Sequence, residues 1–173
     1  MTLALLLGRQ GLRVNLVEAG EAIVTELRAS TFHPPTLDML RSAGIDLVGE
    51  GLVSPTWQIR DHISGDAAIF DMAVLAEETQ HPYRLQCEQH KLSHALLNAI
   101  RTKHDNVDVA FSRAATQVEQ GSDFATVRCA DGTVIRSAYV VGCDGAHSVV
   151  RAAMGQKLGG KTYPETMILV TTE

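Results

Sequence analysis

Apolar residues dominate, or recur every three or four positions, in three stretches of the chain, and this spacing predicts helices. The first and second stretches are followed by Gly11 and Gly44, as expected at helix ends that need a left-handed residue. A shorter helix is expected from about His147 to Met154, ended by Gly155. The three main predicted helices are Thr2–Gln10, Thr36–Ala43 and Gln89–Thr102.

Other apolar runs are short and bounded by turn residues, which predicts strands. Ser64–Asp66 marks a hairpin, and turns at Gly121-Ser122 and Asp131-Gly132 mark an antiparallel meander. The continuous apolar run Tyr139–Cys143 is typical of a buried parallel strand. Together with the helices, these strands indicate an α/β fold with an antiparallel insert. The predicted strands are Leu12–Glu18, Trp57–His62, Ala68–Asp71, Val107–Phe111, Ala114–Glu119, Phe124–Cys129, Val134–Ser137, Tyr139–Cys143 and Met167–Thr171.

The composition narrows the classes of function that the chain can have. Its 173 residues are 45% hydrophobic, enough for a buried core. Acidic residues outnumber basic ones, 20 to 15, which argues against a nucleic-acid partner. No apolar run approaches the ~20 residues of a membrane span, and no signal peptide is expected around Leu3–Leu7. The odd cysteine count, 3, predicts buried structural thiols in a reducing, cytoplasmic compartment.

A carboxylate ends the first predicted strand, and this is the first candidate site. Helix, strand and terminal acid form the second half of a dinucleotide-binding βαβ unit, in which Glu18 would accept hydrogen bonds from the ribose hydroxyls of an adenosine. The usual G-x-G-x-x-G fingerprint begins about 20 residues before such an acid. Counting back from Glu18, we expect the phosphate loop and its strand to precede Met1. The alternative is that Glu18 is a solvated strand end.

The second candidate site is the segment Cys143–Arg151, which follows the apolar run Tyr139–Cys143. Gly145 allows a close approach of the backbone to a ligand, and Asp144 can hold a turn or accept from a ligand hydroxyl. Ser148 can cap the next helix, whose amino end favours a phosphate, and Arg151 adds a positive charge. The alternative is a plain strand, turn and helix held by Asp-Gly.

Four segments, in order, resemble one family, the class A flavoprotein aromatic hydroxylases, which are p-hydroxybenzoate hydroxylase-like FAD-dependent monooxygenases. The most specific is VVGCDGAHSVVRAAMG, which is similar to the family motif D-G-x-x-S-x-x-R. The others are LALLLGRQGLRVNLVEAG, LRASTFHPPTLDMLRSAGI and CEQHKLSHALL. The resemblance implies a Rossmann-like, glutathione-reductase-type FAD-binding domain with an antiparallel meander, plus part of a β-sheet substrate layer.

The resemblance also implies roles for individual residues. Glu18 would bind the adenosine ribose, and Arg28 would lie against the FAD pyrophosphate or ribitol. Gln89 would hydrogen-bond the ribityl or phosphate region. The motif that in the family serves both FAD and NAD(P)H would contribute four residues. These are Asp144, Gly145, Ser148 and Arg151. The resemblance assigns no catalytic residue and no metal ligand to this chain.

The implied function is an FAD- and NAD(P)H-dependent monooxygenase that uses O2 to hydroxylate a small aromatic or phenolic substrate, and the cofactor carries out the oxygen chemistry. An oligomer is compatible with this function. The alternatives are a related flavoprotein, such as a halogenase or a reductase, or an incomplete chain that binds no FAD. The expected divisions are a partial FAD-binding domain (1–50), the start of the substrate layer (51–85), the rest of the FAD-binding domain (86–160) and the entry to a substrate domain (161–173).

Other residue patterns carry less weight. His90 and His94 have metal-ligand spacing on a helix, but the sequence offers no third ligand. His147 beside Ser148 does not make a hydrolase site, because adjacent residues rarely meet as base and nucleophile and no G-x-S-x-G is present. Trp57 and Phe70 are expected to be core residues of the β-layer more than substrate contacts.

Overall fold

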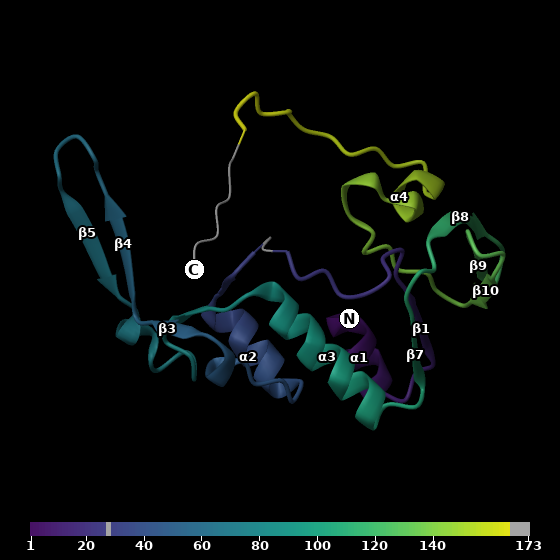
Figure 1. Ribbon diagram of the computed structural model, residues 1–173, viewed down its shortest axis with the longest axis horizontal. Helices are drawn as coiled ribbons and strands as arrows, with labels where there is room; N and C mark the ends of the chain where they lie inside the picture. The colour runs from purple at the N-terminus through teal and green to yellow at the C-terminus, as the bar shows by residue number, and fades with distance from the viewer. Residues whose placement is uncertain (27–28, 167–173) are drawn as a thin grey trace. The chain divides into compact units, whose positions relative to one another are not determined.

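The computed structural model describes residues 1–26 and 29–166 (Figure 1). The chain divides into two compact units. Unit 1 contains Met1–Asn15 and Ile23–Asp108, and unit 2 contains Leu16–Ala22 and the chain from Val109 onward. Each unit therefore combines segments that are far apart in sequence. The expected divisions after residues 50, 85 and 160 stay a prediction. None of the helices in residues 1–26 and 29–166 has the length and hydropathy of a membrane-spanning segment.

Three helices build the core of unit 1: α1 (Thr2–Arg9), α2 (Pro34–Ser42) and α3 (Gln89–Lys103), and all three were predicted. α2 starts earlier than expected because Pro34 and Pro35 fit its first turn, where no backbone donor is needed. Helix α1 packs against α3. Leucine and isoleucine side chains fill the space between these elements. The most deeply buried are Leu5, Leu40, Leu47, Leu85 and Ile100.

A small antiparallel sheet lies beside these helices, in the order β2 (Thr31–Phe32), β6 (Arg84–Gln86) and β3 (Leu52–Ser54). Two short 3-10 turns, Val48–Glu50 and Met72–Leu75, occur in the same unit. None of these strands was predicted. Each has only two or three residues, which is too short to show an alternating pattern, and each is stabilised by its partner strand.

The predicted hairpin is confirmed as β4 (Thr56–Arg60) and β5 (Ala67–Asp71), and Figure 1 shows it extending beyond the other elements of unit 1. Trp57 lies opposite Phe70 in the antiparallel register. The expectation that these two rings belong to a core is wrong, because Trp57 is 49% exposed and Phe70 is 50% exposed.

β1 (Val14–Val17) pairs with β7 (Val107–Ala110), and the division between the units falls within this pair. The Val14 N–H donates to the Asn106 carbonyl, and the Glu18 N–H donates to the Ala110 carbonyl. Partner numbers rise together, so the strands are parallel. Helix α1 followed by strand β1, which belongs to a parallel pair, is the α/β arrangement that the sequence predicts.

Unit 2 contains the predicted meander, in which β8 (Ala115–Gln120), β9 (Ala125–Cys129) and β10 (Val134–Ser137) pair in sequence order. A register shift interrupts β8 near its start. The predicted short helix is α4 (Val149–Ala153), which packs against β8 and follows a 3-10 turn at Gly145–His147. The expected strand at Met167–Thr171 lies outside the described residues.

The prediction of a buried strand at Tyr139–Cys143 is wrong, because the segment has no strand geometry. Tyr139 is 87% exposed and Val141 is 60% exposed. A strand needs a hydrogen-bonded neighbour, and no strand in the described residues pairs with this run. The prediction of buried thiols also fails at Cys143, which is exposed. Cys87 and Cys129 are buried, and burial raises the pKa of both thiols.

Candidate functional site

The side chain of Glu18 stands at the carboxyl end of the parallel pair β1–β7. Ligands of open α/β sheets bind at this end of the strands. The Oε1 atom of Glu18 accepts the backbone N–H of Gly20 at 2.8 Å, which fixes the direction of the carboxylate. Oε2 makes no hydrogen bond to the described residues, and the side chain is exposed. Glu18 can therefore accept hydrogen bonds from a ligand.

The turn that carries Glu18 is held by the segment after β7, and sequence reasoning missed this segment. The Ser112 N–H donates to the Gly20 carbonyl and the Arg113 N–H donates to the Glu18 carbonyl, both at 2.8 Å. Ser112 has a φ of 54°, a left-handed conformation that is uncommon for residues other than glycine. The available signal was positional, because this segment follows the end of β7 at Ala110 as Glu18 follows the end of β1 at Val17.

Asp144 accepts hydrogen bonds from other residues of the predicted motif. Its Oδ1 accepts the Ser148 hydroxyl at 2.5 Å, and its Oδ2 accepts the backbone N–H groups of Val149 at 2.7 Å and Val150 at 3.2 Å. Ser148 Oγ in turn accepts the Arg151 N–H at 2.9 Å, which confirms the predicted helix cap. The carboxylate and the hydroxyl thus satisfy the otherwise unpaired donors at the start of α4.

The electrostatics of Asp144 reflect these contacts. Burial raises its pKa, but the hydrogen bonds from Ser148 and from the backbone of Val150 and Val149 outweigh burial and leave the pKa below its ordinary value of 3.8. The carboxylate is therefore ionised at neutral pH. Its negative charge lies next to the amino end of α4, where backbone dipoles favour an anion.

Arg151 reaches back over the same loop. Its guanidinium donates to the Gly145 carbonyl at 3.2 Å and to the Ala146 carbonyl at 2.7 Å. Gly145 has a φ of 75°, which only glycine adopts without strain. The structure thus brings Asp144, Gly145, Ser148 and Arg151 together as one self-supporting loop, in which the polar side chains chiefly hold the backbone in shape.

Gln89 belongs to unit 1, where it is the first residue of α3. Its N–H donates to the Ala29 carbonyl at 3.1 Å, and the Cys87 N–H donates to the Ser30 carbonyl at 2.7 Å. The side-chain amide is exposed and has no hydrogen bond within the described residues. Arg28, the next residue before Ala29, lies outside the described residues.

The remaining candidates form no comparable site. The rings of His90 and His94 lie 6.2 Å apart, edge to face, on α3. Among residues 1–26 and 29–166, no three His, Cys, Asp or Glu side chains are grouped as a metal site would need. Taken separately, the exposed Glu18 carboxylate can accept hydrogen bonds from hydroxyl groups, and the exposed Gln89 amide can donate to an oxygen anion.

Comparison with known proteins agrees with these features. Para-nitrophenol 4-monooxygenase of Pseudomonas sp. (strain WBC-3) is 29% identical over 95% of this chain and 42% of its own length. The crystal structure of p-nitrophenol 4-monooxygenase PnpA from Pseudomonas putida DLL-E4 matches 94% of this chain and 42% of that protein, with a TM-score of 0.86 and 30% identity. The chain spans less than half the length of these relatives.

A complex of aklavinone-11 hydroxylase with FAD and aklavinone matches 89% of this chain and 32% of that protein, with a TM-score of 0.73 and 27% identity. These neighbours share the predicted Rossmann-like α/β architecture. The model of the family described as FAD binding domain matches residues 1–173, the whole chain. The chain therefore belongs to the FAD binding domain family, and its resemblance to the flavoprotein monooxygenases is confirmed.

Proposed function

We propose that this chain supplies the FAD-binding part of a cytoplasmic monooxygenase that uses NAD(P)H and O2 to hydroxylate a small phenolic ring. The observation that carries the proposal is the Glu18 carboxylate, which is exposed at the carboxyl end of two parallel strands and oriented by the Gly20 N–H. A carboxylate at this position suits the two hydroxyls of a ribose. The names of the relatives support the choice of a phenolic substrate.

The residues present fit FAD in different ways. Glu18 would hold the adenosine ribose, and Gln89 would donate to the ribityl or phosphate region from the amino end of α3. Arg28 is proposed to contact the pyrophosphate or ribitol. The Asp144–Arg151 loop would present backbone groups of fixed geometry to the cofactor. Bound FAD would supply the exchange of electrons with NAD(P)H and the activation of O2.

The FAD part of the proposal is tested by titrating the purified chain with FAD and following flavin absorbance and fluorescence. Glu18→Gln keeps the shape of the side chain but removes its charge. We expect about tenfold weaker binding, the effect of one weakened charge-assisted hydrogen bond. Glu21→Gln is the matched control, since Glu21 is an exposed glutamate of the same turn. Equal affinities for the two variants would contradict the role of Glu18.

The reaction is tested on the full-length protein with NAD(P)H, O2 and 4-nitrophenol. The expected result is NAD(P)H oxidation coupled to O2 consumption, with a product that carries one additional oxygen atom by mass spectrometry. NAD(P)H oxidation without oxygen in the product would favour a reductase. Halide-dependent product formation would favour a halogenase. If no flavin is bound, the alternative of an incomplete chain that binds no FAD is favoured.

A further inference from the structure

An aromatic pair and an arginine form a surface patch in unit 1 that the FAD-binding residues do not explain. Trp57 on β4 lies opposite Phe70 on β5, with ring centroids 6.1 Å apart and planes inclined by 44°. The guanidinium carbon of Arg84, on β6, lies 5.9 Å from the centroid of the Trp57 ring. We call these three residues the aromatic–arginine patch.

The hairpin is apolar on the face that carries the patch. Side chains of directly paired residues share a face, and the face repeats every second residue. Ile59 pairs with Ala68 and therefore extends the face of Trp57 and Phe70. The opposite face carries Thr56, Gln58, Arg60 and Asp71, with Ala67 and Ile69. Two large rings that are each half exposed offer a planar ligand a surface for stacking.

Arg84 has a charge without a counterion among the described residues. Its Nε is buried and has no hydrogen-bond partner there, and no carboxylate of the described chain forms an ion pair with it. Buried polar groups are normally hydrogen-bonded, and an arginine is suited to an oxygen anion. Other arginines are satisfied: Arg60 donates twice to Gln58, and Arg151 donates to two carbonyls.

We propose that the aromatic–arginine patch binds a planar aromatic anion, a phenolate, and is a substrate-recognition subsite of the proposed hydroxylase. The ring would stack on Trp57 and Phe70 while its oxygen pairs with the Arg84 guanidinium. Arg84 then selects the ionised over the neutral phenol, and the two rings select a flat ligand. This inference rests on the proposed function, because it names the residues that recognise the substrate of that reaction.

Trp57 is the single tryptophan of the sequence, so its fluorescence reports on this patch alone. The experiment titrates the purified chain, without FAD, with 4-nitrophenolate and with neutral nitrobenzene at the same pH. We expect saturable quenching by 4-nitrophenolate and about tenfold weaker binding of nitrobenzene, the change that one lost charge-assisted contact produces. Free N-acetyltryptophanamide under the same conditions corrects for light absorbed by the ligands.

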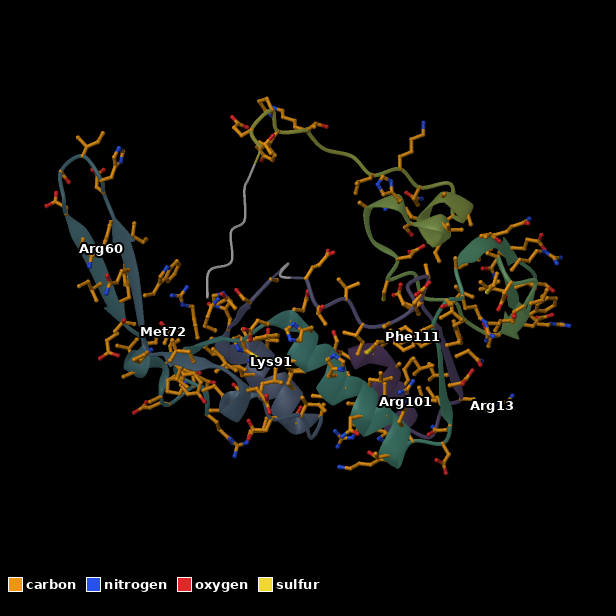
Figure 2. All side chains as sticks on the ribbon, viewed as in Figure 1. Arg13, Arg60, Met72, Lys91, Arg101 and Phe111 are labelled. Carbon is orange, nitrogen blue, oxygen red and sulfur yellow. The ribbon has the colours of Figure 1, made fainter. Side chains whose placement is uncertain are left out.

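Variants separate the patch from general effects of charge. Arg84→Gln should weaken 4-nitrophenolate binding about tenfold, and Arg84→Lys should keep much of the affinity. Arg60→Gln is the matched control and should leave binding unchanged, because Arg60 (labelled in Figure 2) lies on the opposite face of the same hairpin. If Arg84→Gln does not fold, Trp57→Phe measured by calorimetry replaces it, with weaker binding expected.

Three results would overturn the proposal: quenching that does not saturate, equal binding of 4-nitrophenolate and nitrobenzene, or equal effects of the Arg84 and Arg60 substitutions. Blue-shifted Trp57 emission of the purified chain that 4-nitrophenolate leaves unchanged would also overturn it, since protein then covers the patch. The FAD titration on the same samples distinguishes this failure from failure of the proposed function. A chain that binds FAD but not 4-nitrophenolate refutes the patch alone.

Discussion

The Nδ1 atom of His81 lies 2.6 Å from Oδ1 of Asp38, and the imidazole is almost completely buried. The other carboxylate oxygen accepts the Thr79 hydroxyl at 2.5 Å. The hydrogen bonds from Thr79 and then His81 hold the pKa of Asp38 below its ordinary value. Because an ionised carboxylate can only accept, Nδ1 of His81 carries the hydrogen. The pair attaches the segment before β6 to helix α2.

Replacing His81 with alanine should destabilise unit 1. The change leaves Asp38 with one unpaired oxygen and opens a cavity, so we expect the free energy of unfolding to fall by about 1–3 kcal/mol. Urea denaturation followed by circular dichroism measures the difference. His62→Ala, at an exposed position in the hairpin turn, should change stability by less than about 0.5 kcal/mol. Similar losses for both variants would show that the His81–Asp38 pair contributes nothing.

The carboxylate of Asp131 predicts a pH dependence of stability. Three hydrogen bonds lower the pKa of Asp131 from 3.8 to about 2: one from the Thr133 backbone N–H, one from the Thr133 side chain and one from Arg113. A pKa lowered on folding stabilises the native state above the unfolded value, and this contribution is lost as the pH falls from near 3.8 through about 2.

Urea midpoints measured between neutral pH and the acid limit test this dependence. Asp131→Asn should be less stable than the unmodified chain at neutral pH, and the difference should shrink as the pH falls through that window. Asp66→Asn is the control, because the Asp66 carboxylate accepts no hydrogen bond within the described residues. A difference that stays constant down to the acid limit would contradict the role of the Asp131 charge.

Gly8 on α1 faces the side chain of Val107 on β7. A Cβ added there would collide with Cγ2 of Val107, a buried and conformationally stiff side chain. Alanine favours helix by up to about 1 kcal/mol, but overpacking costs about 1–3 kcal/mol, so Gly8→Ala should be destabilising on balance. Gly49→Ala meets nothing within 4 Å and is the control. A thermal unfolding midpoint for Gly8→Ala at or above that of the unmodified chain would disprove the collision.

Gly142, beside the Asp144 loop, also leaves no space for a side chain. A Cβ at this position would lie 2.6 Å from Cβ of Val150 and 3.0 Å from Oδ1 of Asp144. We expect Gly142→Ala to loosen the cap of α4, to speed amide exchange at Val149 and Val150, and to weaken FAD binding. Gly159→Ala has open space around it and should leave both unchanged. Unchanged amide exchange in Gly142→Ala would show that the loop adjusts without cost.

The elements that sequence reasoning found are those whose pattern is local. The helix Gln89–Lys103 differs by one residue from its prediction, because its apolar face repeats over several turns. The strands Thr31–Phe32, Leu52–Ser54 and Arg84–Gln86 were missed, since they exist through pairing between distant segments. Tyr139–Cys143 fails for the converse reason: apolar residues alone do not supply a neighbouring strand.

In the candidate site, too, local features could be predicted from the sequence, whereas contacts that depend on how a loop folds could not. The capping role of Ser148 follows from its position just before a short helix, and the structure confirms it. That Arg151 donates to the carbonyls of Gly145 and Ala146 depends on how the loop folds back, which no spacing rule contains. The left-handed conformation of Ser112 also lay beyond prediction, because serine has no preference for it.

The pairing of β2 with β6 carries a consequence for the order of folding. The hydrogen bond from Thr31 to Gln86 joins residues 55 positions apart, whereas the β4–β5 hairpin closes through one short turn inside that loop. Each doubling of loop length adds about 0.6 kcal/mol to the entropy cost of closure. The hairpin and its two aromatic rings should therefore form before the β2–β6 contact, and the hairpin then shortens the loop that this contact closes. During refolding, Trp57 fluorescence should change before circular dichroism reports that the helices are complete.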